Sequence, residues 1–179
     1  MIFFGKQQEK TLFLVCPMDF IEPVIRERYK GNSFFYTALG VFLEFDESTQ
    51  YNLYKLIKKE RIDYITLVAK ADGDFYQGAL LDWQTPLHLP VEQSLAQLKT
   101  GIAPRIERQK GSFLKSRMII GEHLNQQRER LLNTKLLGIG LLRNGIGVDS
   151  LVYEPSNKSF TTTGDVLNRA KLFDGMMAN

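Results

Sequence analysis

The chain has 179 residues, of which 44% are hydrophobic and 24% are charged, a composition typical of globular proteins and not of disordered ones. This length suits one domain, so we predict a single domain over residues 1–179. The net charge of +3 is too small to favour nucleic acid or an anionic membrane as a partner.

The single cysteine of the chain excludes an internal disulfide and fits a reducing compartment. The first residues, MIFFGKQQEKT, lack the basic start and long apolar core of a signal peptide. No apolar run approaches the roughly 20 residues that span a bilayer. We therefore expect a cytoplasmic protein that does not enter a membrane.

Residues 11–19, TLFLVCPMD, predict a buried strand that ends in a polar corner. A short continuous apolar run of this kind is typical of a central strand in a parallel sheet. Cys16, Pro17 and Asp19 follow the run. Ligands of open α/β sheets bind just beyond the carboxyl ends of the strands. Cys16 and Asp19 therefore stand where a site is expected.

A helix is predicted from Phe20 to a stop at Gly31. Asp19 is placed to cap this helix, with Glu22 three residues later as in a capping box. The cap is the simpler role for Asp19, and general-base catalysis is the alternative. The aromatic residues 33–37 predict the second strand.

A small-residue corner at 38–40 precedes residues 41–45, which form either a short strand or a buried connection. Ser48 is the predicted N-cap of a helix over residues 49–60. Residues 62–68, rich in β-branched side chains, predict the next strand. Strand, helix and strand in this order indicate a βαβ unit and a parallel sheet.

The segment after Val68, AKADGDFYQGA, predicts a polar loop at the same edge of the sheet as Asp19. It carries Lys70, Asp72 and Asp74. With Asp19 these side chains could bind a small anion or, through carboxylates and carbonyls, Mg²⁺ or Ca²⁺. An ordinary polar turn explains Asp-Gly-Asp equally well.

A linker at residues 85–90 separates this half from a helical half with a final hairpin. We predict helices over 91–100, 112–134 and 135–144, strands over 147–154 and 159–162, and a helical tail over 164–179. Within the second helix, the candidate inner residues are Phe113, Ile119, Ile120, Leu124, Leu131 and Leu132. The fold class is thus α/β: a central, mostly parallel sheet flanked by helices, with a C-terminal hairpin added at its edge.

Several side chains have both a plain and a functional interpretation. Cys16 is either a small buried apolar residue or a thiol activated by Lys70. His88 and His123 lack metal-ligand spacing and fit surface or core positions. A basic patch either meets an anionic partner or forms a solvated helix face; it comprises Arg105, Arg108, Lys110, Lys115 and Arg117.

The order of elements resembles the β-class carbonic anhydrase family over nearly the whole chain. The matching segments are LFLVCPMDF, YKGNSFFYTALG, YNLYKLIKKERIDYITLVAKADG and HLNQQRERLLNTKLLGIGLLRNGIGVDSLVYEPSNKSF. The resemblance implies that family's fold, with a first strand ending in Cys-x-Asp-Ser-Arg and a third ending in Gly-His-x-x-Cys. It also implies a homodimer or larger homo-oligomer.

The departures from the family pattern fall on its zinc ligands, which are two cysteines and one histidine. Aligned on Asp19, those ligands fall on Pro17, Lys70 and Gly73, and the family's arginine falls on Ile21. Proline and glycine have no ligating side chain, and protonated lysine does not bind zinc. The resemblance therefore implies a degenerate member that lacks the zinc ligands, for which no zinc or other cofactor is expected.

Two functional hypotheses follow for this degenerate member. The first is a protein without zinc and without carbon dioxide hydration, which binds, scaffolds or regulates. The second is an enzyme with a reworked, metal-free pocket that acts on a small anionic substrate. In this hypothesis Asp19 is the catalytic residue, and Lys70, Asp72 and Cys16 bind the ligand.

Overall fold

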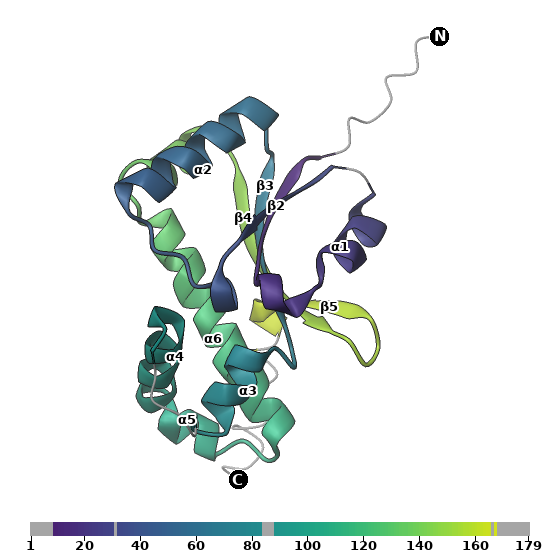
Figure 1. Cartoon of the computed structure of the whole chain (residues 1–179), viewed down its shortest axis with the longest axis vertical. Coiled ribbons are helices and arrows are strands. Elements are labelled where there is room, and N and C mark those ends of the chain that lie inside the picture. The colour runs from purple at the N-terminus through teal and green to yellow at the C-terminus, as the bar shows by residue number, and fades with distance from the viewer. Residues whose placement is uncertain (1–8, 31, 84–87, 166, 168–179) are drawn as a thin grey trace.

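The computed structural model describes residues 9–30, 32–83, 88–165 and 167. Its centre is a five-stranded sheet of order β2-β1-β3-β4-β5, in which the first four strands are parallel and β5 is antiparallel to β4 (Figure 1). The strands are β1 (Thr11–Val15), β2 (Ser33–Thr37), β3 (Tyr64–Lys70), β4 (Gly147–Glu154) and β5 (Ser159–Thr162). The predicted α/β fold with a C-terminal hairpin at the sheet edge is confirmed.

Helices cover the two faces of the sheet unequally. Among the described helices, α1 alone packs on one face, whereas α2, α6 and α7 pack on the other (Figure 1). The helices are α1 (Glu22–Tyr29), α2 (Glu47–Glu60), α3 (Asp74–Leu80), α4 (Pro90–Gly101), α5 (Ala103–Glu107), α6 (Ser112–Leu132) and α7 (Leu137–Arg143). Two short 3₁₀ turns, η1 (Pro17–Asp19) and η2 (Leu39–Val41), follow β1 and β2.

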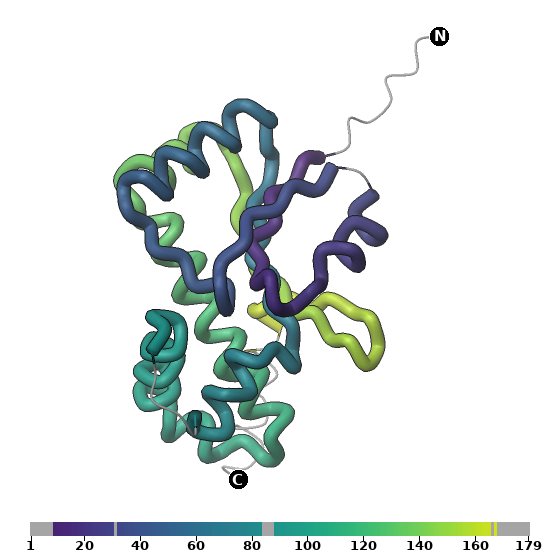
Figure 2. The backbone as a smooth tube through the Cα atoms, viewed as in Figure 1, coloured from purple at the N-terminus to yellow at the C-terminus, as the bar shows by residue number. Residues whose placement is uncertain are grey.

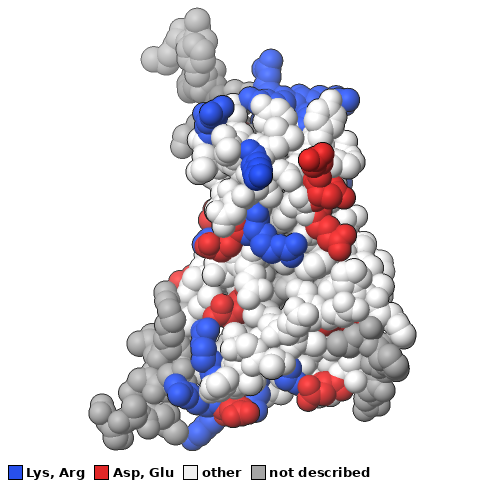
Figure 3. All heavy atoms as spheres, turned by 90° about the vertical axis from the view of Figure 1, so that its left-hand side faces the viewer, with Lys and Arg blue, Asp and Glu red and all other residues white. Residues whose placement is uncertain are grey.

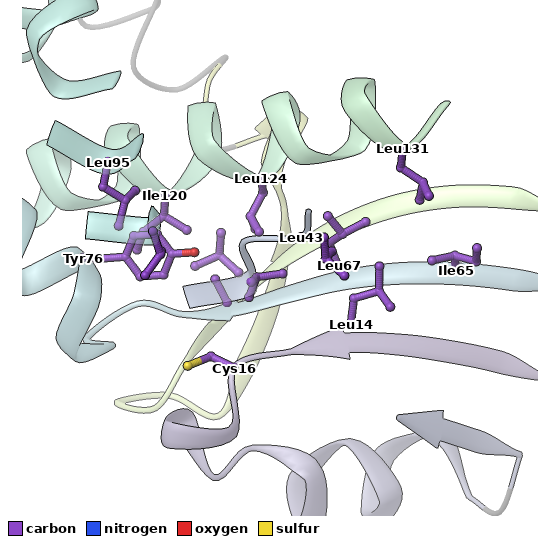
Figure 4. Packing of buried hydrophobic residues seen from close by; sticks show 14 of the residues in the cluster. Leu14, Cys16, Leu43, Ile65, Leu67, Tyr76, Leu95, Ile120, Leu124 and Leu131 are labelled. Carbon is purple, nitrogen blue, oxygen red and sulfur yellow. The ribbon is translucent and has the colours of Figure 1, made fainter. Parts of the chain in front are cut away.

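The apolar run in β1 is continuous because both of its faces are buried. Leu12 and Leu14 point toward the α2 and α6 side, while Phe13 and Val15 point toward α1. Figure 4 shows Leu14 beside the side chains of β3 and beneath α6. Each fully buried aliphatic side chain of this kind contributes roughly 1.5–3 kcal/mol. The core therefore fixes the position and register of β1, and with it the corner that follows.

Helices α3, α4 and α5 lie beyond the carboxyl ends of the strands (Figures 1 and 2). The long α6 joins them to the sheet, because it packs against α3, α4, β3 and β4. The corner that follows β1 is thus enclosed between the sheet and these helices. None of the described helices is both long and apolar enough to cross a membrane.

The segment after β3 differs from the prediction. β3 continues to Lys70, and residues predicted as part of a polar loop form α3 after Gly73. This helix has seven residues, too few to be stable alone, so its packing on α4 and α6 determines it. Tyr76 and Ala79 are its buried residues. Seven residues are too few to show a clear helical period, so the sequence did not reveal that packing.

The start of the first helix also differs from the prediction. Residues Pro17–Asp19 form η1, Phe20 takes a positive φ of 51°, and α1 begins only at Glu22. The N-cap position is Ile21, which has no side-chain cap. The predicted cap by Asp19 is therefore wrong, and the Asp19 carboxylate is free to make other contacts.

Most of the predicted inner residues of α6 are buried. Ile119, Ile120, Leu124 and Leu131 are buried as predicted, whereas Phe113 is 56% exposed. The short α5 was not predicted, because Gly101 and Pro104 read as helix breakers and its five residues show no clear period. Most of the predicted helical tail over 164–179 lies outside the described residues.

Asp46, rather than the predicted Ser48, is the N-cap of α2. Its Oδ1 accepts a hydrogen bond of 2.6 Å from the Thr49 amide, and the helix begins at Glu47. We expect Asp46→Ala to lower the Tm by roughly 2–4 °C, since an unpaired amide is left at the helix end. Ser48→Ala is the matched control and should leave the Tm unchanged. Equal losses in the two variants, measured by thermal unfolding, would contradict this assignment.

Candidate functional site

Asp19 lies at the carboxyl ends of the strands, as the sequence predicts, and only 6% of its surface is exposed. Its Oδ2 accepts a hydrogen bond of 3.2 Å from the Lys70 amide at the end of β3. Asp19 therefore links the ends of β1 and β3. Its own amide donates to the Cys16 carbonyl at 3.1 Å, which holds η1 in place.

Lys70 and Asp72 meet at the same corner. The Lys70 Nζ lies 3.2 Å from an Asp72 carboxylate oxygen, and the Asp72 side chain is 60% exposed. An ion pair this exposed contributes little to stability. Asp74, which was predicted to join the cluster, is the first residue of α3 and is exposed. Asp19 and Lys70 are thus the inner residues of the candidate site, and Asp72 forms its rim.

Burial raises the pKa of Asp19 to about 6, against its usual 3.8. The hydrogen bond from the Lys70 amide and the charge of Lys70 oppose this rise, whereas the charges of Asp72 and Asp74 add to it. A carboxyl group with a pKa near 6 can exchange a proton close to neutral pH. The corner therefore holds one group suited to acid–base chemistry.

Cys16 is 1% exposed and lies at the end of β1, in the same buried cluster as Leu14 and Leu67 (Figure 4). Burial raises the pKa of the Cys16 thiol, although backbone N–H groups, the Gly40 N–H first among them, oppose the rise. The nearby Asp19 raises it further. A buried thiol with a raised pKa is a poor nucleophile. The structure favours the plain interpretation of Cys16 as a small buried side chain.

Two buried side chains that were not predicted to belong to the site meet at the Gly40 carbonyl. The Tyr76 hydroxyl donates to it at 3.0 Å, and His123 Nε2 lies 3.0 Å from it. Gly40 has a φ of +57°, and a Cβ there would lie 2.6 Å from Val91 Cγ2. The corner at residues 38–40, noted in the sequence, is thus fixed between β1, α3 and α6.

His123 and Tyr76 are both neutral components of this network. Burial lowers the pKa of His123 to about 4, and burial raises the pKa of Tyr76 well above its usual value. Nδ1 of His123 has no hydrogen-bond partner among the described residues. The prediction of a core histidine is confirmed for His123, and His88 is exposed. Only recognition of α3 as a helix would have revealed the role of Tyr76.

The donor set at this corner does not fit zinc. No group of three His, Cys, Asp or Glu side chains that could hold a metal ion occurs among the residues that the structure describes. A Cβ added to Gly73 would lie 2.9 Å from Asp19 Oδ1 and 3.2 Å from the Lys70 carbonyl oxygen. The Asp19 carboxylate thus fills the space into which a side chain at position 73 would extend.

Two of the five cations of the predicted basic patch are paired with carboxylates. Arg105 pairs with Glu122 at 2.6 Å, and Arg117 pairs with Glu154 in a nearly buried contact. Figure 3 shows blue and red side chains intermixed at the lower end of the molecule, where α5 lies. Arg117 and Glu154 instead brace α6 against the end of β4. The solvated-face interpretation suits the three exposed or half-exposed cations that remain.

No model of a protein family matches the sequence, and no curated protein gives a significant match. Solved structures do match. A tetrameric β-carbonic anhydrase of Sordaria macrospora superposes with a TM-score of 0.74 at 14% identity, over 89% of this chain and 83% of that chain. The wild-type β-carbonic anhydrase CafD of Aspergillus fumigatus gives 0.72 at 16% identity, over 89% and 92%.

A third structure, a Coccomyxa β-carbonic anhydrase in complex with acetazolamide, gives a TM-score of 0.69 at 13% identity, over 88% of this chain and 73% of that chain. The chain has the β-carbonic anhydrase fold. The resemblance seen in the sequence is confirmed at the level of the fold. At these identities the likeness carries no statement about activity, so the function depends on the site.

On the β-carbonic anhydrase fold, the corner between β1 and β3 is the place where the sequence resemblance puts the zinc ligands. Two of those positions, Lys70 and Gly73, contact Asp19, and the third, Pro17, lies in the same 3₁₀ turn as Asp19. The structure therefore brings Asp19, Lys70, Asp72 and Cys16 to one corner, as predicted. It adds Tyr76 and His123 behind them.

Proposed function

We propose that this protein uses the β-carbonic anhydrase fold without the zinc site and without carbon dioxide hydration, in a binding, scaffolding or regulatory role. The observation that carries the proposal is the position of Asp19. Its carboxylate bonds to the Lys70 amide and lies against Gly73, so it fills the corner where the sequence resemblance places the ligands. Without a bound metal ion, no water molecule is acidified to near-neutral pH.

The donor set supports the same proposal. Cys16 is the only soft ligand at the corner, and the His123 ring is engaged with the Gly40 carbonyl. Zinc sites are built from several Cys, His and carboxylate groups held at about 2.0–2.3 Å from the metal. A single thiol and a single buried carboxylate fall short of such a set.

Zinc content tests this proposal directly. We expect the purified protein to retain far less than about one zinc per chain after incubation with zinc and dialysis. Carbon dioxide hydration, followed by the pH change on mixing, should not exceed the uncatalysed rate. An active β-carbonic anhydrase handled in parallel is the control.

Two other results of the zinc assay would each have a distinct meaning. Near-stoichiometric zinc together with zinc-dependent hydration would overturn the proposal. Zinc that is retained by the parent and lost in Cys16→Ser, without hydration, would show an isolated thiolate contact and leave the loss of activity standing.

A second candidate function is a metal-free enzyme that acts on a small anionic substrate. The observation in its favour is the buried Asp19 carboxyl with a pKa of about 6, beside the Lys70 cation. Asp19 would transfer the proton, and Lys70 would bind the anion. Substrate turnover that is lost in both Asp19→Asn and Lys70→Met would favour this candidate. Binding of the anion with no turnover would favour the first.

We also propose that the protein forms a homodimer or a larger homo-oligomer in the cytoplasm. The support is the fold, since the matching Sordaria macrospora enzymes are described as tetrameric. No nucleic-acid or membrane partner is proposed.

A further inference from the structure

The face of the sheet that α1 covers is apolar over only one half. At the carboxyl-terminal half, Phe13 and Val15 pack with Ile21 and Ile25 beneath α1. Toward the amino-terminal ends of the strands, the side chains on this face of the sheet are polar, and a cavity of about 750 Å³ lies there. Its lining combines Thr11, Thr66 and Asp149 of the sheet with Arg28 of α1, the α1 C-cap Lys30, and Arg128 of α6, so the cavity extends from the α1 face as far as α6. We call it the sheet-face cavity.

The sheet-face cavity is at the opposite end of the strands from Asp19. Thr11 is the first residue of β1, and Asp149 pairs in register with Thr66. A strand that alternates sides places these residues on the face that Phe13 and Val15 occupy further along. Hydroxyl and carboxylate groups at such positions form a polar floor where an apolar one would be expected.

The walls of the cavity are held by contacts within the protein. Tyr29 packs on Phe13 with ring centroids 5.0 Å apart, and the Arg28 guanidinium lies 5.8 Å from the centre of the Phe160 ring. On the other side, the buried hydroxyls of Ser150 and Thr163 are 2.6 Å apart. The cavity is therefore formed before any ligand arrives.

Among the described residues, the cations of the cavity have no carboxylate partner across it. Within the described part of the chain, Arg128 approaches only its helix neighbour Glu129, at 3.8 Å, and its Nε is buried without a hydrogen-bond acceptor. Glu9 and Asp149 also line the cavity, yet neither forms an ion pair with Arg128 among these residues. A buried guanidinium N–H without an acceptor is costly, so an acceptor from a ligand is favourable there.

From these features we infer that the sheet-face cavity binds a small molecule that carries a carboxylate or phosphate group, with Arg128 as its main anchor. Guanidinium groups bind such oxyanions through paired N–H donors, and threonine hydroxyls donate to the same oxygens. The volume lies within the range of small-molecule sites.

Titration with inorganic phosphate and with succinate, at constant ionic strength, tests this inference and separates the two kinds of oxyanion. We expect calorimetry on the whole protein to detect binding of at least one probe. Arg128→Gln should weaken that binding at least about tenfold, as loss of a charge-assisted bidentate contact does. Arg130→Gln is the matched control: it is exposed on the same helix, with its guanidinium 5.1 Å from the centre of the Phe42 ring.

If Arg128→Gln proves unfolded by circular dichroism, Thr66→Val removes a buried hydroxyl of the cavity at nearly constant volume and should also weaken binding. Absence of binding by both probes would overturn the inference, as would equal losses in the Arg128 and Arg130 variants. The zinc assay does not bear on this cavity, so the two proposals can fail separately.

Discussion

Replacing Asp19 by asparagine should make the protein more stable at pH 7. The pKa of Asp19 is raised to about 6 in the folded chain by burial, against 3.8 as its usual value. Folding therefore favours the protonated carboxyl, and this contribution is full below pH 3.8 and is lost as the pH rises through 6. At pH 7 the ionised group costs up to about 3 kcal/mol, which a neutral amide avoids.

Urea unfolding of Asp19→Asn at pH 7 and at pH 4 measures this effect. The gain should be largest at pH 7 and should shrink toward pH 4, where the parent carboxyl is mostly protonated. Asparagine still offers an oxygen to the Lys70 amide, so that hydrogen bond can persist. Asp72→Asn, which alters the exposed carboxylate of the same corner, should change stability by less than about 1 kcal/mol. A variant less stable than the parent at both pH values would refute this account.

His123→Gln should reveal a pH dependence of the opposite sign. The pKa of His123 is lowered to about 4 by burial, so the unfolded chain takes up a proton below about pH 6.5 while the folded chain stays neutral. His123 thus stabilises the fold fully above pH 6.5, and the contribution is lost as the pH falls toward 4. The loss amounts to about 3 kcal/mol. Glutamine keeps an N–H donor for the Gly40 carbonyl but does not titrate.

The measurement is the unfolding free energy from pH 4 to pH 7. His123→Gln should be about 2 kcal/mol less stable than the parent at pH 7, from lost packing, with the difference narrowing or reversing at pH 4. Tyr76→Phe is the matched control, because it removes the other donor to Gly40 without changing titration in this range. A pH dependence in the His123 variant parallel to that of the parent would exclude His123 as its source.

The two titrations oppose each other over nearly the same pH window. As the pH rises from 4 to 6, Asp19 lowers stability and His123 raises it, each by about 3 kcal/mol. Their contributions to the parent should largely cancel, and each single variant should expose the slope of the remaining group. A buried carboxylate that costs stability at neutral pH is typical of sites kept for function.

The sequence predicted the architecture well because its signals are local. The continuous apolar run before Cys16 and the β-branched strand predicted at residues 62–68 identify the central strands of a parallel sheet. The turn at residues 155–158 marks the final hairpin. The sequence did not predict α3, because packing on α4 and α6 stabilises its seven residues and they show no clear helical period of their own.

The candidate site was predicted only in part. The rule that ligands bind at the carboxyl ends of strands correctly brought Asp19 and Lys70 together. The cap assigned to Asp19 was wrong, because a left-handed residue at Phe20 separates it from the helix. Tyr76 and His123 could not be assigned to the corner, since their common partner is the backbone carbonyl of Gly40.

The sequence by itself determined the order of the five strands, the likeness to the β-carbonic anhydrases, and the absence of ligating side chains at positions 17 and 73. The tertiary structure alone decided that Asp19 bonds to Lys70, 51 residues away, and that His123 meets Gly40 across 83 residues. It also decided where a cavity remains between the end of α1, the sheet and α6. The physical reason is that the periodicity of apolar residues shows which face of a helix or strand is buried. Hydrogen bonds and cavities depend instead on which helices and strands pack against one another.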